Sequence, residues 1–183
     1  MGKVNISSQP QLVKTRDRIR EVVALARAEG KRIGLVPTMG ALHEGHLSLV
    51  VACKAECDVT VVTVFVNQAQ FAAGEDFERY PRELAADMEV LGRLGAEWVF
   101  APGQEEMYSD DFSTYVQPPS VADPWEGRCR VNHFRGVATV VLKLMNIIPA
   151  DTAYFGQKDY QQAVVIDPGF NAAEHAVIQE GWQ

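Results

Sequence analysis

The sequence has few cysteines and no long hydrophobic run. Its only cysteines are Cys53, Cys57 and Cys129, an odd number that forms no disulfide framework and has no second pair to complete a zinc site. The N-terminus lacks the apolar core of a signal peptide, and no apolar run approaches the length of a membrane span. We therefore expect a cytoplasmic protein whose thiols are buried or idle, with no membrane partner.

Positive charge is also scarce. The chain has 17 Lys and Arg against 24 Asp and Glu, a formal net charge of −7 at pH 7. Nucleic acids and anionic membranes are bound through basic surfaces, so neither is expected as a partner. The balance still permits a local basic pocket for a small anion. At 183 residues and 47% hydrophobic side chains, the chain is sufficient for one domain with a sizeable core.

Helical and strand patterns alternate along the chain. Apolar periodicity predicts helices over residues 9–29, 82–94, 134–148 and 158–166. A further helix is expected after the loop that follows residue 36, and it ends at about residue 56. Short apolar runs predict strands at residues 33–36, 58–66, 98–101 and 152–155, whereas residues 102–132 are interrupted by proline and indicate loops. The near-continuous β-branched run 58–66 is typical of a parallel strand covered on both faces. This order predicts an α/β fold, a doubly wound parallel sheet that binds ligands beyond the carboxyl ends of its strands.

Residues 34–46 combine a short strand, a glycine-marked loop and the start of a helix. Gly40 and Gly45 permit backbone conformations and close approaches that a Cβ would block. The unpaired amides of a helix start suit an anion such as phosphate. His43 and His46 are three residues apart and would share one helical face. A polar turn with two surface histidines is the alternative interpretation of this spacing alone.

The string Pro37-Thr38-Met39-Gly40-Ala41-Leu42-His43-Glu44-Gly45-His46 resembles the nucleotide-binding signature of the pantothenate synthetase (pantoate–β-alanine ligase) family. Segments 65–71, 80–82, 133–137 and 155–162 resemble the same family in the same order, so that the likeness covers roughly residues 10–166. The resemblance implies a Rossmann-like sheet of the H-x-G-H nucleotidyl transferase type.

The resemblance also implies a reaction. ATP would activate pantoate as a pantoyl adenylate with release of pyrophosphate, and β-alanine would then displace AMP to give pantothenate. ATP, Mg²⁺, pantoate and β-alanine are the expected small molecules, and a homodimer is the expected assembly. Two other hypotheses stay open: a nucleotidyl transferase acting on a phosphorylated acceptor, and a non-catalytic nucleotide-binding remnant.

Site residues follow from the matched motifs. The resemblance implies catalytic roles for His43, His46 and Lys158, with His46 as a general acid. ATP would be bound by Met39, Gly40, Ala41, Leu42, His43, Glu44, Gly45, His46, Gly156, Gln157, Lys158 and Asp159. Gln70 and Gln162 would hold pantoate, with Asn67 lining the site. Asp87 matches an acidic position that helps to bind Mg²⁺, although a solvated helix carboxylate is an equal alternative.

The sequence departs from the family pattern in several places. Gln68 stands where the family usually has proline, which predicts a looser loop and weaker pantoate affinity. Residues 1–166 are expected to form the nucleotide- and pantoate-binding domain and 167–183 a divergent tail, with the family's Ser/Arg-rich loop and C-terminal domain not visible. The chain therefore resembles an N-terminal portion, for which we expect poor activity. Arg128, Arg130 and Arg135 suit structural ion pairs at least as well as substrate contacts.

Overall fold

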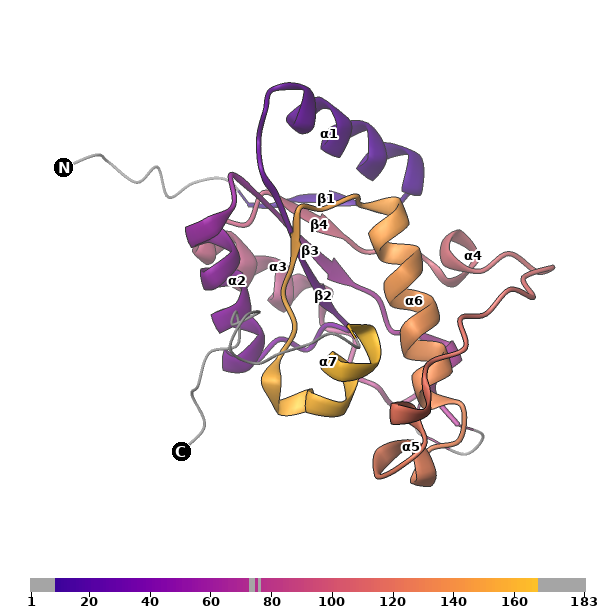
Figure 1. Cartoon of the computed structure of the whole chain (residues 1–183). Coiled ribbons are helices and arrows are strands. Elements are labelled where there is room, and N and C mark those ends of the chain that lie inside the picture. Colours follow the sequence, from indigo (N-terminus) through magenta and orange to yellow (C-terminus); the bar gives the residue numbers. More distant parts are fainter. Residues whose placement is uncertain (1–8, 73–74, 76, 168–183) are drawn as a thin grey trace.

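Five parallel strands form the centre of the fold, and helices cover both faces of this sheet (Figure 1). The computed structural model describes residues 9–72, 75 and 77–167. The strands are β1 (Gln11–Val13), β2 (Ile33–Thr38), β3 (Val59–Val64), β4 (Trp98–Phe100) and β5 (Thr152–Ala153). Their order is β1-β4-β3-β2-β5. The chain moves outward from β2 through β3 to β4 and then returns to β5 on the other side of β2, so that β2 and β5 flank the topological switch point where such sheets bind ligands.

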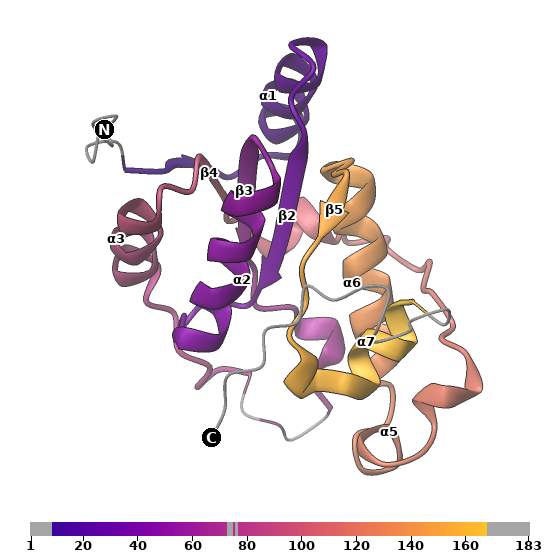
Figure 2. The same ribbon diagram turned by 60° about the vertical axis from the view of Figure 1, so that its left-hand side comes forward.

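Two layers of helices enclose the sheet. The helices are α1 (Arg16–Ala28), α2 (Glu44–Glu56), α3 (Leu84–Leu94), α4 (Gln104–Met107), α5 (Glu126–Cys129), α6 (His133–Ile147) and α7 (Tyr160–Ile166), with 3-10 turns η1 (Gln68–Gln70), η2 (Ser120–Ala122) and η3 (Gln157–Asp159). Figures 1 and 2 show α2 and α3 on one side of the sheet and α6 on the other. Val61 packs in the core cluster that includes α1 and α6, whereas its neighbour Val62 packs in the cluster of α2 and α3. Both valines are fully buried, which confirms the expected strand with two covered faces.

The prediction of one helix over residues 9–29 is wrong at its start. Residues Gln11–Val13 form the edge strand β1, which pairs with β4, and the helix begins only at Arg16. The backbone amide of Gln11 donates to Glu97 O (2.9 Å), and that of Ala101 donates to Val13 O (2.9 Å). Val13 is buried, whereas Leu12, which matched the helical pattern, is 40% exposed. Pairing with the sheet outweighs the weak local preference of so short a segment.

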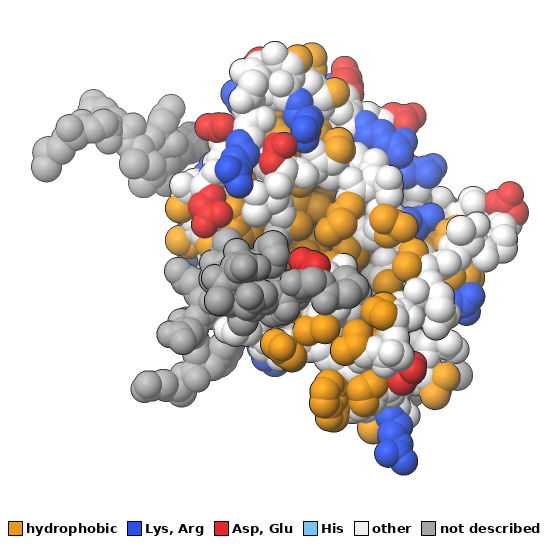
Figure 3. Space-filling model, viewed as in Figure 1, with side chains coloured by type: hydrophobic (Ala, Val, Ile, Leu, Met, Phe, Trp, Pro, Cys, Tyr) orange, Lys and Arg blue, Asp and Glu red, His pale blue; other side chains and the backbone are white. Residues whose placement is uncertain are grey.

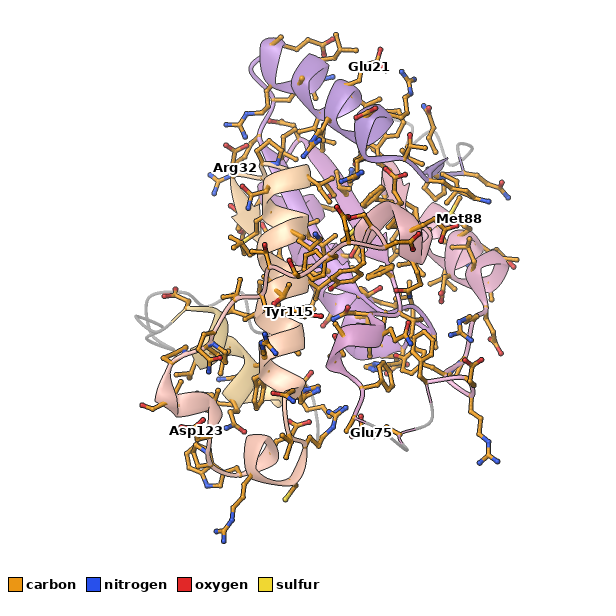
Figure 4. All side chains as sticks on the ribbon, turned by 90° about the vertical axis from the view of Figure 1, so that its right-hand side faces the viewer. Glu21, Arg32, Glu75, Met88, Tyr115 and Asp123 are labelled. Carbon is orange, nitrogen blue, oxygen red and sulfur yellow. The ribbon has the colours of Figure 1, made fainter. Side chains whose placement is uncertain are left out.

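The loop-rich excursion expected over residues 102–132 contains α4, η2 and α5, and part of it runs along α6. In Figure 4 Tyr115 lies against α6, where the Arg135 guanidinium is 4.0 Å from its ring centroid. The amide of Val116 also donates to Thr139 Oγ1 (3.0 Å). In the view of Figure 3, hydrophobic side chains gather in the lower half of the molecule, around α5 and α7. Trp125, which precedes α5, and Tyr160, the first residue of α7, are exposed. No helix in the described ranges is long and apolar enough to cross a membrane.

Candidate active site

A pocket opens at the carboxyl end of β2, beside the switch point with β5. Five segments meet there: the end of β2, the first turns of α2, η1, the apolar side of α6, and the η3–α7 region. Its walls are formed by Pro37, Thr38, Met39, His43, Gly45, His46, Ser48, Leu49, Phe65, Asn67, Gln70, Tyr80, Val137, Val140, Val141, Leu144, Phe155, Gly156, Gln157, Lys158, Asp159 and Gln162. The family-like motifs are therefore brought to one place by the fold.

The loop between β2 and α2 has an uncommon backbone conformation, and Asp87 of α3 holds it in place. Gly40 and Ala41 both have positive φ, +83° and +52°, a region that costs a side chain energy. A Cβ on Gly40 would lie 2.9 Å from Val64 Cγ1, so that glycine is required there. The buried carboxylate of Asp87 accepts the amides of Ala41 (Oδ2, 3.1 Å) and Leu42 (Oδ1, 2.9 Å). These bonds fix the path by which the loop enters α2.

His43 and His46 cap the start of α2 reciprocally. His43 Nδ1 accepts from the amide of Gly45 (3.2 Å), and His46 Nδ1 accepts from the amide of His43 (3.4 Å), with ring centroids 4.1 Å apart. A nitrogen that accepts a bond carries no proton, so that each neutral ring carries its proton on Nε2. The two histidines thus offer Nε2–H donors, which suit the oxygens of an anion such as phosphate.

The protonation of His46 is set by its surroundings. Burial and the neighbouring His43 lower its pKa to about 4, Lys158 adds to this effect, and Asp159 and Asp87 oppose it. Free of ligand, His46 is therefore a neutral hydrogen-bond donor at pH 7. These influences also place Lys158 and Asp159, which follow β5, within electrostatic range of the histidine pair that follows β2.

Gln70 is a buried amide side chain that also lines the pocket. Its Oε1 accepts from Asn67 Nδ2 (3.0 Å), and its Nε2 lies 3.1 Å from Met39 Sδ. Asn67 is itself held by the Tyr108 hydroxyl, which donates to its Oδ1 (2.8 Å), and Asn67 Nδ2 also donates to Gly136 O (3.2 Å). A chain of hydrogen bonds therefore orients Gln70 before any ligand arrives.

Not every residue named from the sequence lines the pocket. Met39, His43, Gly45, His46, Asn67, Gln70, Gln162 and the stretch Gly156–Asp159 do; Gly40, Ala41, Leu42, Glu44 and Asp87 do not. Within the described residues no group of three His, Cys, Asp or Glu side chains could hold a metal ion. Both oxygens of Asp87 accept loop amides, so its carboxylate fits a loop-holding role, and its role as a Mg²⁺ ligand stays a prediction.

Sequence reasoning missed an apolar wall and three aromatic residues. Val137, Val140, Val141 and Leu144 of α6 line the pocket. Their helical spacing was visible in the sequence, but the same pattern predicts ordinary core packing. Phe65, Tyr80 and Phe155 also line the pocket; they lie in segments that resemble the family, but no site role was assigned to them. No local signal distinguishes such residues, because their role depends on which elements face each other.

The parallel sheet with its switch point and the histidine pair at the start of α2 define an α/β protein of the nucleotidyl transferase type. Comparison with known proteins gives the family. The model of the pantoate-beta-alanine ligase family matches residues 11–176, and the chain belongs to that family. The match extends beyond residue 166, where the divergent tail was expected, and most of that tail lies outside the described residues.

Individual relatives agree with this assignment. A pantothenate synthetase of Brucella anthropi is 51% identical over 156 residues, which are 85% of this chain and 54% of that protein. The crystal structure of pantothenate synthetase from Thermus thermophilus matches with a TM-score of 0.81 and 46% identity over 86% of this chain and 56% of that one. A pantoate-beta-alanine ligase from Francisella tularensis, complexed with beta-gamma ATP and beta-alanine, matches with a TM-score of 0.82 and 36% identity over 87% of this chain and 61% of that one. The chain spans about half the length of the curated relatives it matches.

Proposed function

We propose that this chain binds ATP and pantoate in the pocket beside β2 and takes part in the ATP-dependent condensation of pantoate with β-alanine. The observation that carries the proposal is that two chemically different sets of residues line one pocket. His43 and His46 offer N–H donors and define a proposed histidine end, while Gln70 and an apolar wall of α6 define a proposed amide end. The Francisella ligase, which was crystallised with beta-gamma ATP and beta-alanine, supports the same choice of ligands.

ATP is assigned to the histidine end. The loop 39–46 would contribute backbone, His43 and His46 would donate Nε2–H to phosphate oxygens, and Gly156–Asp159 would close around the nucleotide with Lys158 as the cation. A bound polyphosphate stabilises the protonated imidazole, so its arrival raises the pKa of His46 from the low value of the free chain. His46 can then supply a proton to the departing phosphate, in keeping with its expected role as a general acid.

Pantoate is assigned to the amide end. It carries a carboxylate, two hydroxyl groups and a dimethyl-substituted carbon. Gln70 and Gln162 can bond its oxygens, with Asn67 orienting Gln70, and Val137 and Val140 of α6 suit its methyl groups. A phosphorylated acceptor would call for more cations, yet the described residues that line the pocket include one lysine and no arginine. This difference favours the ligase over a nucleotidyl transferase that acts on a phosphate ester.

The reaction needs no covalent bond to the protein. A pantoate carboxylate oxygen attacks the α-phosphorus of ATP, and the bond to the bridging oxygen of the β-phosphate breaks, which releases pyrophosphate. The β-alanine amine then attacks the acyl carbon of the adenylate. The bond from that carbon to the phosphate oxygen breaks, AMP leaves with the bonding electrons, and the amine nitrogen releases a proton to solvent. The chain's contribution is to position the reactants and to stabilise charge on the phosphates. A cytoplasmic location and a homodimer are proposed with this activity, on the family resemblance alone.

Mg²⁺ is proposed as the companion of ATP, but no step is assigned to it. A nucleotide-bound Mg²⁺ usually takes one or two carboxylates together with phosphate oxygens and water. The described residues offer no cluster for it beyond single carboxylates such as Asp87 and Asp159.

The proposed function is tested by AMP release from the 183-residue chain. We expect AMP only when ATP, pantoate and β-alanine are all present, and pyrophosphate with ATP and pantoate alone. A chain with Arg128→Lys should give the same result as the unsubstituted chain, because Arg128 is exposed and does not line the pocket. AMP release that ignores pantoate, or transfer of AMP to a phosphorylated acceptor, would contradict the proposal.

A further inference from the structure

Arg130, which caps the end of α5, joins the start of α6 and α5 itself to Glu75, which is 55 residues away in the sequence. Its guanidinium makes two bonds to Glu75 (Nε to Oε1, 2.7 Å; Nη2 to Oε2, 3.0 Å) and one to Glu126 (Nη1 to Oε1, 2.7 Å). The same Nη1 lies 3.1 Å from His133 Nε2, in the first turn of α6. Figure 4 shows Glu75 near this end of α6. Both members of the Arg130–Glu75 pair are less than one-third exposed, and the fork geometry fixes the orientation of the guanidinium.

The arginine determines which nitrogen of His133 carries the proton. A guanidinium only donates hydrogen bonds, so His133 Nε2 must accept, and the ring proton lies on Nδ1. Nδ1 is 2.9 Å from the backbone carbonyl oxygen of Gln70, to which it therefore donates. His133 is buried. Burial lowers its pKa and the adjacent Arg130 adds to this, while the bond to Gln70, Glu126 and Glu75 act in the opposite sense. The neutral ring keeps its single donor directed at Gln70.

That donor bears on the residue assigned to pantoate. Asn67 and Met39 contact the end of the Gln70 side chain. The position of its Cα, however, depends on the backbone of η1. η1 lies directly against α6: a Cβ on Gly136 would be 2.2 Å from Ala69 O. The His133 bond fastens the last residue of this turn to the same helix, one helical turn before Gly136.

We propose that His133, oriented by Arg130 and Glu75, is a positioning residue that holds Gln70 in place for the hydroxy acid; the inference rests on the proposed function of the pocket. His133 does not line the pocket and acts through the Gln70 carbonyl. The role belongs to one donor atom, Nδ1, rather than to the bulk of the ring, and this distinction can be measured.

Two substitutions separate the donor from the bulk. In His133→Asn the side-chain amide nitrogen can occupy the place of Nδ1 and still donate to Gln70 O, although the side chain is smaller. In His133→Gln the amide reaches the place of Nε2 toward Arg130 and abandons Gln70 O, although its volume is closer to that of histidine. Pantoate and ATP affinities of the 183-residue chain are measured by calorimetry, with Arg128→Lys as the control on the neighbouring arginine.

We expect the His133→Asn variant to bind pantoate within about threefold of the unsubstituted chain. The His133→Gln variant should bind pantoate about tenfold more weakly, which is the ratio for the loss of one hydrogen bond. ATP affinity should be unchanged in both, which also verifies folding. If the His133→Gln variant does not fold, Arg130→Met replaces it, because methionine cannot donate to His133 Nε2. Nitrogen NMR of the His133 ring should then show loss of the single Nδ1–H tautomer, together with weaker pantoate binding. Equal pantoate affinity in His133→Asn and His133→Gln, or weaker binding by His133→Asn than by His133→Gln, would overturn the positioning role. No pantoate binding by the unsubstituted chain would overturn the proposed function and this inference with it.

Discussion

Replacing Asp87 by asparagine tests how the nucleotide loop is held. Each carboxylate oxygen of Asp87 accepts one loop amide, from Ala41 and Leu42. Asparagine keeps the shape but offers only one oxygen, and its amide nitrogen would face an N–H group. One charge-assisted hydrogen bond is lost, worth about 1.5–3 kcal/mol, and a loop donor near the pocket stays unpaired. If the loop must be reordered before ATP binds, the affinity for ATP falls by at least about tenfold, since about 1.4 kcal/mol corresponds to a factor of ten.

The assay is calorimetry with ATP, once with Mg²⁺ and once with a chelator. Glu89→Gln is the matched control, because it removes the same charge from α3 at an exposed side chain. Loop-holding predicts the same loss of affinity in both buffers for Asp87→Asn and no loss for Glu89→Gln. A loss confined to the buffer with Mg²⁺ would refute this reasoning and favour direct metal binding by Asp87.

Three further predictions concern His46 and the buried thiols. The pKa of His46 is lowered to about 4 in the folded chain, against about 6.5 in the unfolded chain. The unfolded chain therefore takes up this proton first as the pH falls, so the free energy of unfolding decreases between pH 6.5 and pH 4. His46→Gln should reduce the drop in unfolding free energy between pH 7 and pH 4.5, and an unchanged drop would contradict the assigned shift. His46→Ala should release no stoichiometric zinc in elemental analysis. Gly34→Ala would place a Cβ 2.2 Å from Cys53 Sγ and should destabilise the fold by about 1–3 kcal/mol in urea unfolding, whereas adding Cys53→Ala should restore part of the loss; no recovery would show that the clash is not with this thiol.

Local sequence patterns were sufficient for strands β2 to β5 and for the loop that carries the histidines. The β-branched run of β3 and the glycine-marked loop after β2 each have a physical cause within a few residues. The edge strand β1 was missed because three residues cannot outweigh a helical pattern until β4 is beside them. The bond from His133 to Gln70 joins residues 63 positions apart, and the valine wall of α6 resembles any buried helix face. Such features depend on which elements meet, and no local pattern encodes them.

Resemblance extended the sequence prediction to individual site residues, and the structure adds how His43, His46 and Gln70 are held. The motif around residue 133 was noted for its likeness alone, and three nearby arginines were left between ion-pair and substrate roles. In the fold, Arg130 is paired with Glu75 and Glu126 and Arg135 lies over Tyr115, while none of the three lines the pocket. The ion-pair interpretation is therefore confirmed for Arg130.

The central claim is that two ends of one pocket hold ATP and pantoate separately, and a pair of substitutions measures it most directly. Gln70→Ala and His46→Ala are each titrated with ATP and with pantoate by calorimetry. We expect Gln70→Ala to weaken pantoate binding by about tenfold or more, the cost of one charge-assisted hydrogen bond, with ATP affinity unchanged, and His46→Ala to weaken ATP binding with pantoate affinity unchanged. Unchanged pantoate affinity in Gln70→Ala, or an equal loss of both ligands in either variant, would contradict the claim.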